Sequence, residues 1–569
     1  MKDSIDAAFS RAATLLPRRS DWTHARPGRD LTAGLMVGLV ALPLALGFGV
    51  SSGMGAGAGL VTAIVAGALA AIFGGSRVQV SGPTGAMTVV LVPIIATHGP
   101  DGVLVVGLLA GVILIGLGAA GAGRFIRYVP VPVVEGFTLG IAAIIGLQQL
   151  PAALGVDVHA EKVLALAWKA VVAWAADPVW VPVAMAAAVV AVILAGARVR
   201  PGLPSSLIAV ALATVANSAL DLGATTISKM PTGLPAPGLP DIPLTQLDAL
   251  LLPAVAVAAL AALESLLSAT VADGMSVGQR HDSNRELVGQ GLANLGAPLF
   301  GGIPATAAIA RTAVNVRSGA TSRLAALTHA LVLLVIVLLA ASWVSEIPLA
   351  ALAGVLVATS VQMVRVSSLT ALLRSTRGDA AVLVITAAAT VLFDLVTAVL
   401  LGLVVAGFIA LRQTARTVRL DEMPLDEGDH TDEEQSLLHE HIVAYRLDGP
   451  LFFAAAHDFL LELSEVGDVR VVILRMSRVT TIDATGAHVL ADTVSRLEGR
   501  GITVLLSGVQ PHHEQVLREL GVHGHLADER HLFDDTPAAI AHARIHAARI
   551  AHTPGGQADL GRSGVVPPT

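Results

Sequence analysis

The 569-residue sequence is poor in three kinds of residue: it has no cysteine, 3% aromatic residues and 14% charged residues. Without cysteine it can form neither a disulfide framework nor a thiolate metal site. Because soluble proteins carry about a quarter charged residues, the shortage of charge indicates a large surface that faces lipid. The net charge of −7 gives no support to nucleic-acid binding. No cofactor-binding loop or catalytic cluster is visible, so we expect no cofactor and no enzyme activity.

What the sequence has in excess is apolar residues, which make up 54% of the chain and give a mean hydropathy of +0.73. Between Leu31 and Leu411 they form stretches separated by short Gly, Pro and Arg breaks. A membrane-spanning helix needs about 20 residues. Nine stretches are candidates for full spans and five are shorter, so we predict 14 membrane segments, with 12 as the alternative. The long stretches lie near 31–50, 57–73, 102–120, 131–150, 179–197, 249–272, 322–341, 348–364 and 395–411, and the short ones near 84–96, 205–218, 286–299, 305–316 and 379–393.

The placement of arginine predicts the orientation of these segments. With the N-terminus inside, the cytoplasmic loops and the end of the last segment hold fifteen arginines, whereas the outside loops hold three lysines. Basic residues collect on the cytoplasmic side, so we predict a multi-pass protein of the inner (plasma) membrane with both ends in the cytoplasm. The arginines are Arg77, Arg124, Arg127, Arg198, Arg200, Arg280, Arg285, Arg317, Arg323, Arg365, Arg374, Arg377, Arg412, Arg416 and Arg419, and the lysines are Lys162, Lys169 and Lys229.

Composition divides the chain into five parts. Residues 1–30 form a cytoplasmic N-terminal segment without the apolar core of a signal peptide, and residues 31–412 form the transmembrane domain. Residues 413–440 are predicted to be an acidic linker, because positions 421–440 are rich in Asp and Glu and lack Lys and Arg. Residues 441–550 alternate strand-like and helix-like patterns, which predicts a soluble α/β domain. Residues 551–569 are predicted to be a disordered tail. The expected strands are 441–447, 469–476 and 502–507, and the expected helices are 454–465 and 485–498.

A weak internal repeat marks two of the short segments. SGPTGA (81–86) and GIPATA (302–307) each place a Gly/Pro break and small residues before a short apolar helix. Seven segments in each half give the halves opposite topology, so the two short helices should point their N-termini at each other near the membrane midplane. Free N–H groups and the helix dipole make such ends favourable for an anion. The alternative is a pair of ordinary Gly/Pro kinks in closely packed helices.

Three stretches carry a resemblance to a known family. Residues 34–90, ESLLSATVADGM (264–275) and NRELVGQGLANLGAPLFGGIPATAAIARTAVN (284–315) resemble the SulP anion transporters, the bacterial relatives of the solute carrier 26 proteins. The soluble domain resembles the STAS domain of the same family.

The resemblance implies an α-helical 7+7 inverted repeat with core and gate domains that move relative to one another, followed by the STAS domain. It implies a homodimer in membrane lipid that transports a small anion such as bicarbonate, sulfate, chloride or a dicarboxylate. It also places the substrate between the starts of the third and tenth helices. The matching positions are Thr84, Gly85 and Ala86, and Ala305, Thr306 and Ala307.

Glu264 lies in the middle of an apolar segment, where a charge costs about 2.5–3.5 kcal/mol and indicates a function. Ser268 follows one helical turn later on the same face. The sodium-coupled bicarbonate branch of the family resembles this sequence here but has Asp and Thr at these positions, so we expect coupling to a proton rather than to sodium. The alternative is a structural Glu bonded to a neighbouring helix.

Arg311 lies within the second short helix. It either adds positive potential to the anion site or binds backbone carbonyls at the cytoplasmic end, and the sequence favours neither.

Two patterns in the soluble domain suggest regulation or metal binding. Asp483-Ala484-Thr485-Gly486 resembles the STAS signature in which the hydroxyl residue is phosphorylated. We interpret Asp483 or Thr485 instead as a helix cap. His542 and His546, one turn apart, could bind a metal, but no third ligand is evident, so we expect an exposed helix face and no metal site.

These features favour secondary transport by proton-coupled symport or anion exchange. An uncoupled anion channel is disfavoured by Glu264. A membrane-tethered STAS regulator is disfavoured because an anchor needs no midplane anion site.

Overall fold

The structure is a computed structural model that divides into two compact units, Met1–Ala406 and Gly407–Thr569. The predicted helix 454–465, most of the acidic linker, the tail beyond residue 551, Arg127, Lys229 and Arg416 lie outside the described residues. The structure describes residues 17, 22, 26–124, 129–160, 162–200, 203–227, 230–241, 247–276, 280–393, 395–415, 419–422, 441–451, 469–526, 528 and 531–551.

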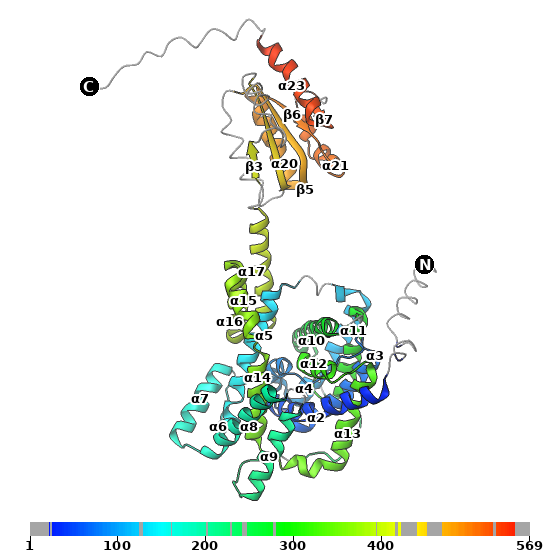
Figure 1. Ribbon diagram of the computed structural model, residues 1–569, viewed down its shortest axis with the longest axis vertical. Coiled ribbons are helices and arrows are strands. Elements are labelled where there is room, and N and C mark those ends of the chain that lie inside the picture. The colour runs from blue at the N-terminus through cyan, green and yellow to red at the C-terminus, as the bar shows by residue number, and fades with distance from the viewer. Residues whose placement is uncertain are drawn as a thin grey trace, which may run out of the picture. The chain divides into compact units, whose positions relative to one another are not determined.

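The first unit is helical (Figure 1). Among the described residues, eight helical stretches are long and apolar enough to cross a membrane. Every predicted stretch falls on a helix, but several helices are short, so the number of 14 segments stays a prediction. The helices are α2 (Pro27–Ser51), α3 (Ala56–Phe73), α4 (Gly85–Ala119), α5 (Val131–Gln148), α6 (Leu150–Leu154), α7 (Val163–Ala176), α8 (Trp180–Val199), α9 (Ser205–Ala219), α10 (Leu247–Met275), α11 (Ser283–Leu299), α12 (Ile309–Arg317), α13 (Arg323–Ser345), α14 (Leu349–Met363), α15 (Val366–Ser375), α16 (Arg377–Leu392) and α17 (Leu395–Ala415).

These helices pack as two groups. In the first group α11 lies against α3 and α4, α13 against α2 and α3, and α10 against α4 and α12. In the second group α5 packs on α16 and α14, and α8 packs on α9 and α14. The groups meet mainly where α2 contacts α9 and α14 and where α4 contacts α5. This division is the arrangement expected of a core and a gate.

Helix α4 consists of two helices joined at Gly99, where φ is 68° and ψ is −172°. Pro100 follows directly and cannot donate a backbone hydrogen bond. The first part, residues 85–98, is about 21 Å long at 1.5 Å per residue. A hydrocarbon core of about 30 Å is too thick for it to cross, which agrees with the short helix predicted near 84–96.

Several features of this unit differ from the prediction made from the sequence. Helices α7 and α15 were not expected, because each is too short to span a membrane and carries a basic residue, Lys169 or Arg374. Arg285 and Arg323, expected in loops, are buried in α11 and α13. Arg285 Nε donates to the Phe73 carbonyl at 3.3 Å and Arg323 Nη1 donates to the Ala71 carbonyl at 2.9 Å. Both cations therefore bind carbonyls left open at the C-terminus of α3.

The second unit contains a five-stranded sheet in the order β3-β4-β5-β6-β7. Only the edge strand β3 is antiparallel to its neighbour. One face packs on α20 and α21 with Leu474, Val504 and Leu490 in the core, and the other packs on α23. Residues 419–422, expected in the linker, form β3. The bounds are β3 (Arg419–Glu422), β4 (Ile442–Leu451), β5 (Val471–Ile482), α20 (Ala484–Gly499), β6 (Thr503–Ser507), α21 (Pro511–Glu519), α22 (Val522–His525), β7 (Leu532–Phe533) and α23 (Thr536–Ala551).

Candidate functional site

Two short strands bring the starts of α4 and α12 together. β1 (Ser81–Gly82) pairs with β2 (Thr306–Ala307) in antiparallel fashion, with Ser81 opposite Ala307 and Gly82 opposite Thr306. Each strand leads into its helix within a few residues. Because the strands of this β1–β2 ribbon are antiparallel, the two helices leave it in opposite directions. That is the arrangement that two repeats of opposite topology require.

The start of α4 is capped by Thr84, whose hydroxyl oxygen accepts the Met87 N–H at 3.4 Å. Gly85 leaves no room for a side chain, since a Cβ there would lie 2.1 Å from Ile145 Cδ1 and 3.1 Å from Phe48. Ala86 is also buried. The first N–H groups of this helix have no acceptor within it, and α5 and α2 cover them in this conformation.

The second helix begins later than predicted, at Ile309 rather than near Ala305. The Asn294 side chain binds both the N–H and the carbonyl of Ala305 at 2.8 Å, and Ser265 Oγ accepts the Ala307 N–H at 3.2 Å. Thr306 lies in β2, with its hydroxyl 3.1 Å from Ser265 Oγ. The backbone N–H groups expected at Ala305 and Ala307 are thus already occupied, and the orphan donors of the helix end belong to residues 309–311.

The Gly302–Pro304 break predicted a helix directly after it, whereas pairing with β1 first extends the chain at Thr306 and Ala307. Asn294 and Ser265, which position this segment, were missed. A polar amide on a membrane helix such as α11 is the signal that could have indicated Asn294.

Arg311 lies in the first turn of α12 and is 1% exposed. One guanidinium nitrogen, Nη2, donates to the Pro83 carbonyl just before α4. The other, Nη1, has no hydrogen-bond partner among the described residues. A Cβ on Gly82 would lie 2.6 Å from Nη1, so a larger residue here would displace the guanidinium from its present position. Arg311 thus binds a backbone carbonyl just before the start of α4, and its charge lies at the start of α12 rather than at the cytoplasmic end of that helix.

Glu264 lies on α10 and is partly exposed. Its Oε2 accepts a hydrogen bond from the Thr84 hydroxyl at 2.9 Å, and it interacts with Thr306 and electrostatically with Arg311. One carboxyl therefore bonds to the cap of α4, interacts with Thr306 of the β2 strand and lies within the electrostatic influence of Arg311 on α12.

Ser268 does not share this environment. Its hydroxyl donates to Thr312 Oγ1 at 3.1 Å, and that oxygen also accepts the Val80 N–H at 3.1 Å. Ser268 thereby holds α10 to the first turn of α12.

A cavity of about 600 Å³ reaches Ala310 and Arg311 from between the two groups of helices. Thr84, Gly85 and Ala86 do not line it, because Phe48 and Ile145 lie against the start of α4. The cavity therefore gives access to the start of α12 only. Its other lining residues are Thr32, Met36, Val40, Leu44, Ile193, Ala197, Leu203, Ser205, Ser206, Val314, Arg317, Ser318, Thr359 and Gln362.

Both helix starts, and the residues that form the polar contacts around them, lie within a region that matches a known family. Residues 28–386 match the sulfate permease family, and residues 436–539 match the STAS domain. The chain belongs to the sulfate permease family.

Relatives agree with this family, and a solved structure shares the fold. The chain is 35% identical to the putative sulfate transporter YvdB of Bacillus subtilis over 89% of this chain and 96% of the relative. It is 30% identical to the bicarbonate transporter BicA of Synechocystis over 90% and 94%. The structure of murine solute carrier 26 family member A9 (Slc26a9), titled an anion transporter, has a TM-score of 0.81 at 18% identity, covering 94% of this chain and 95% of that one.

As a sulfate permease family member, the chain is a multi-pass membrane protein with a C-terminal STAS domain, and a transporter rather than an enzyme. The helical membrane fold and the parallel sheet of the STAS domain confirm the fold class predicted from the sequence.

In the STAS domain, Asp483 is the cap of α20. Its Oδ1 accepts the Gly486 N–H at 2.7 Å. Gly486 packs against the Leu451 carbonyl, which would lie 2.2 Å from a Cβ. Thr485 is exposed and does not cap the helix. The capping interpretation therefore applies to Asp483 alone, and the hydroxyl of the signature faces solvent.

Proposed function

We propose that this sulfate permease family protein is a secondary active transporter that carries a small anion, bicarbonate, sulfate or a dicarboxylate, across the plasma membrane by alternating access. The observation that carries the proposal is Arg311 Nη1, a buried cationic donor without a partner among the described residues, at a helix start that lines a cavity. A buried donor left unsatisfied costs about 1–3 kcal/mol, so the site favours an incoming anionic acceptor.

The anion site consists of the first-turn N–H groups of α12, the Arg311 guanidinium and the start of α4. Two helix dipoles and one cation supply positive potential there. Backbone donors select for charge and compact size rather than for one anion, which accords with relatives named for both sulfate and bicarbonate. Thr84, Gly85 and Ala86 complete the site from the other side, and the segment Ala305–Ala307 positions α12.

We propose that Glu264 couples transport to protons. The ionised carboxylate partly neutralises Arg311 and repels an anion at the start of α4. When the carboxyl is protonated, this repulsion of the anion ends. The protonated carboxyl can still form its hydrogen bond with the Thr84 hydroxyl. Proton and anion therefore assist each other's binding, and the assistance is reciprocal because binding free energies are linked. Such linkage produces symport.

In this proposal the second group of helices, which contains α5, α8, α9, α14 and α16, moves against the first group, which contains α4 and α12. This movement produces alternating access. The cavity is lined by the ends of α2, α8, α9, α12 and α14 that bear Thr32, Ala197, Ser205, Arg317 and Gln362. By the arginine rule these ends are cytoplasmic, so this conformation faces inward. Withdrawal of Ile145 from Gly85 would open the start of α4. We also propose that the N-terminus and the STAS domain are cytoplasmic and that the protein works as a homodimer in the lipid.

Uptake into proteoliposomes tests the proposal. The purified protein is reconstituted and supplied with radiolabelled bicarbonate, sulfate or fumarate, while the sodium gradient and the pH gradient are varied separately. We expect uptake that an inward proton gradient drives and that sodium does not affect. Uptake that requires sodium contradicts proton coupling. Uptake that requires an anion inside indicates exchange, and passive flux indifferent to both gradients indicates a channel.

A further inference from the structure

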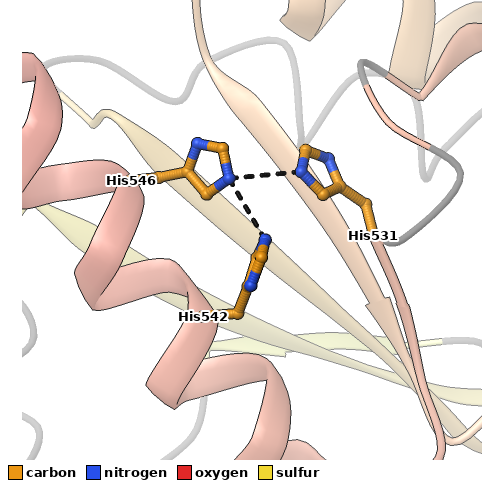
Figure 2. A group of neighbouring side chains, drawn as sticks. All are labelled: His531, His542 and His546. Atoms are coloured by element: carbon orange, nitrogen blue, oxygen red, sulfur yellow. Dashed lines mark hydrogen bonds between the residues drawn. The ribbon is translucent and has the colours of Figure 1, made fainter.

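Three histidines of the STAS domain face one another (Figure 2). His531 comes directly before β7 and is buried, and His542 and His546 lie one turn apart on α23 and are half-buried. His546 Nε2 is 3.3 Å from His531 Nε2 and 3.2 Å from His542 Nε2. The expectation of an exposed face with no third ligand was wrong, because His531, directly before β7, supplies a third ring.

Hydrogen bonding does not account well for this arrangement. A ring nitrogen carries either one proton or one lone pair in the ring plane. His546 Nε2 faces two other ring nitrogens and can make one well-aligned bond with only one of them. The second contact is then left as a poor hydrogen bond in a partly buried place, which has a cost in stability.

A metal ion makes use of all three nitrogens. With Zn–N bonds of about 2.0–2.1 Å, tetrahedral geometry places ligand nitrogens about 3.3–3.4 Å apart. Two of the three separations already match this value, and all three ligand atoms lie within 4.8 Å of one another. The third separation, between His531 and His542, has to shorten to the same value when all three rings bind one ion.

We propose that His531, His542 and His546 bind a zinc ion, with water in the fourth position. Imidazole nitrogens suit zinc, and three histidines with an open position is an established zinc set. The ion would join the middle of α23 to the residue before β7, beside the sheet face where α23 packs on Val471, Ile473 and Leu505. Zinc binding would therefore fix the C-terminal helix of the domain.

The state of His531 is compatible with this role. Burial lowers the pKa of His531, and the neighbouring His546 and His542 rings lower it further, against smaller opposing effects of Asp528 and the Val504 backbone. The lower pKa favours the uncharged ring, which is the form that binds a metal.

Zinc titration of the full-length protein tests the site. The protein is purified in detergent through a tag without histidine, stripped with a chelator, and titrated with Zn²⁺ in competition with a chromophoric indicator. We expect one zinc per chain. His542→Ala and His546→Ala should each weaken binding by at least about tenfold, since even outer-shell partners of a metal contribute 10–100-fold. His488→Ala, at a histidine whose side chain is 72% exposed, should bind like the wild type.

A second measurement separates ligand loss from misfolding. Co²⁺ in a tetrahedral site absorbs strongly in the visible range, and this band should appear in the wild type and in H488A but not in H542A. Zinc should raise the unfolding temperature of the STAS domain within the full chain, and H542A should lose this increase while it still folds. No zinc binding by the wild type, or equal binding by H542A and the wild type, overturns the proposal.

Discussion

Both units have apolar cores, but among the described residues only the membrane unit also buries charged and amide side chains. In the membrane unit Leu339 and Trp343 are about four-fifths exposed, at 82% and 80%, whereas Arg311, Glu286 and Asn294 are buried. In the STAS domain the buried residues are mainly aliphatic side chains between the sheet and its helices. A lipid solvent accepts apolar side chains and excludes polar ones.

The buried polar groups of the membrane unit also have a specific structural role. Buried polar groups of the membrane unit bind backbone from distant segments. Glu286 accepts the N–H groups of Gly75 and Ser76 at 2.8 and 3.1 Å, and Asn294 holds Ala305. Glu286 thereby positions the segment that follows α3, and Asn294 positions the segment that precedes α12. A change to a buried polar group should therefore affect transport in the membrane unit, whereas a comparable change in the STAS domain should affect stability.

The largest effect is expected from Ala310→Trp. Ala310 is exposed to the cavity, so an indole there fills the route to the start of α12 without disturbing the core. We expect no measurable uptake by protein that inserts normally. Ala305→Trp is a poorer test, because Ala305 is fully buried. Leu339→Trp, on an exposed face of α13, is the control. Normal uptake by A310W would exclude this cavity as the substrate route.

Arg311→Met should weaken anion binding by about 10–100-fold, the equivalent of one hydrogen bond to a charged group. The rise in substrate concentration for half-maximal uptake measures this loss. Arg374→Met, at an exposed position on α15, is the matched control and should transport normally. If R311M binds the anion as the wild type does but yields less folded protein, Arg311 has a structural role. In that case this buried polar group affects stability rather than transport, against the expectation for the membrane unit.

Glu264→Gln should change coupling more than it changes binding. Gln retains the shape and an oxygen that accepts the Thr84 hydroxyl, but its amide neither takes up nor releases a proton. We expect uptake that no longer responds to a pH gradient, measured at several external pH values. Because the carboxylate that repels the anion is gone, affinity at high pH should exceed that of the wild type. A pH dependence like that of the wild type would assign proton coupling to another group.

The smallest effect is expected in the STAS domain. Asp483→Ala removes the cap of α20 and should lower the stability of this domain by about 1 kcal/mol, measured by thermal unfolding of the full chain. Thr485→Ala should change neither stability nor transport, because Thr485 is exposed and is not the cap. Altered transport by T485A, with unchanged stability, would point to regulation through the signature.

Local patterns predicted most helices correctly, because the formation of a helix depends mainly on the residues within it. Apolar length indicated α2, α10 and α13, and the break at residues 99–100 limited the first half of α4. The start of α12 was misplaced because pairing between segments more than 200 residues apart, Ser81 with Ala307, decides it. No local propensity reports such pairing.

By itself the sequence determined that this is a membrane protein with an acid on α10, an arginine on α12 and a soluble α/β domain. Composition and periodicity are properties of short stretches of sequence, so the features that they predict can be recognised without knowledge of the fold. Only the tertiary structure decided which N–H groups remain open at the site, that Glu264 contacts the cap of α4, and that His531 joins His542 and His546. These depend on which distant backbone and side-chain groups satisfy one another when the chain packs.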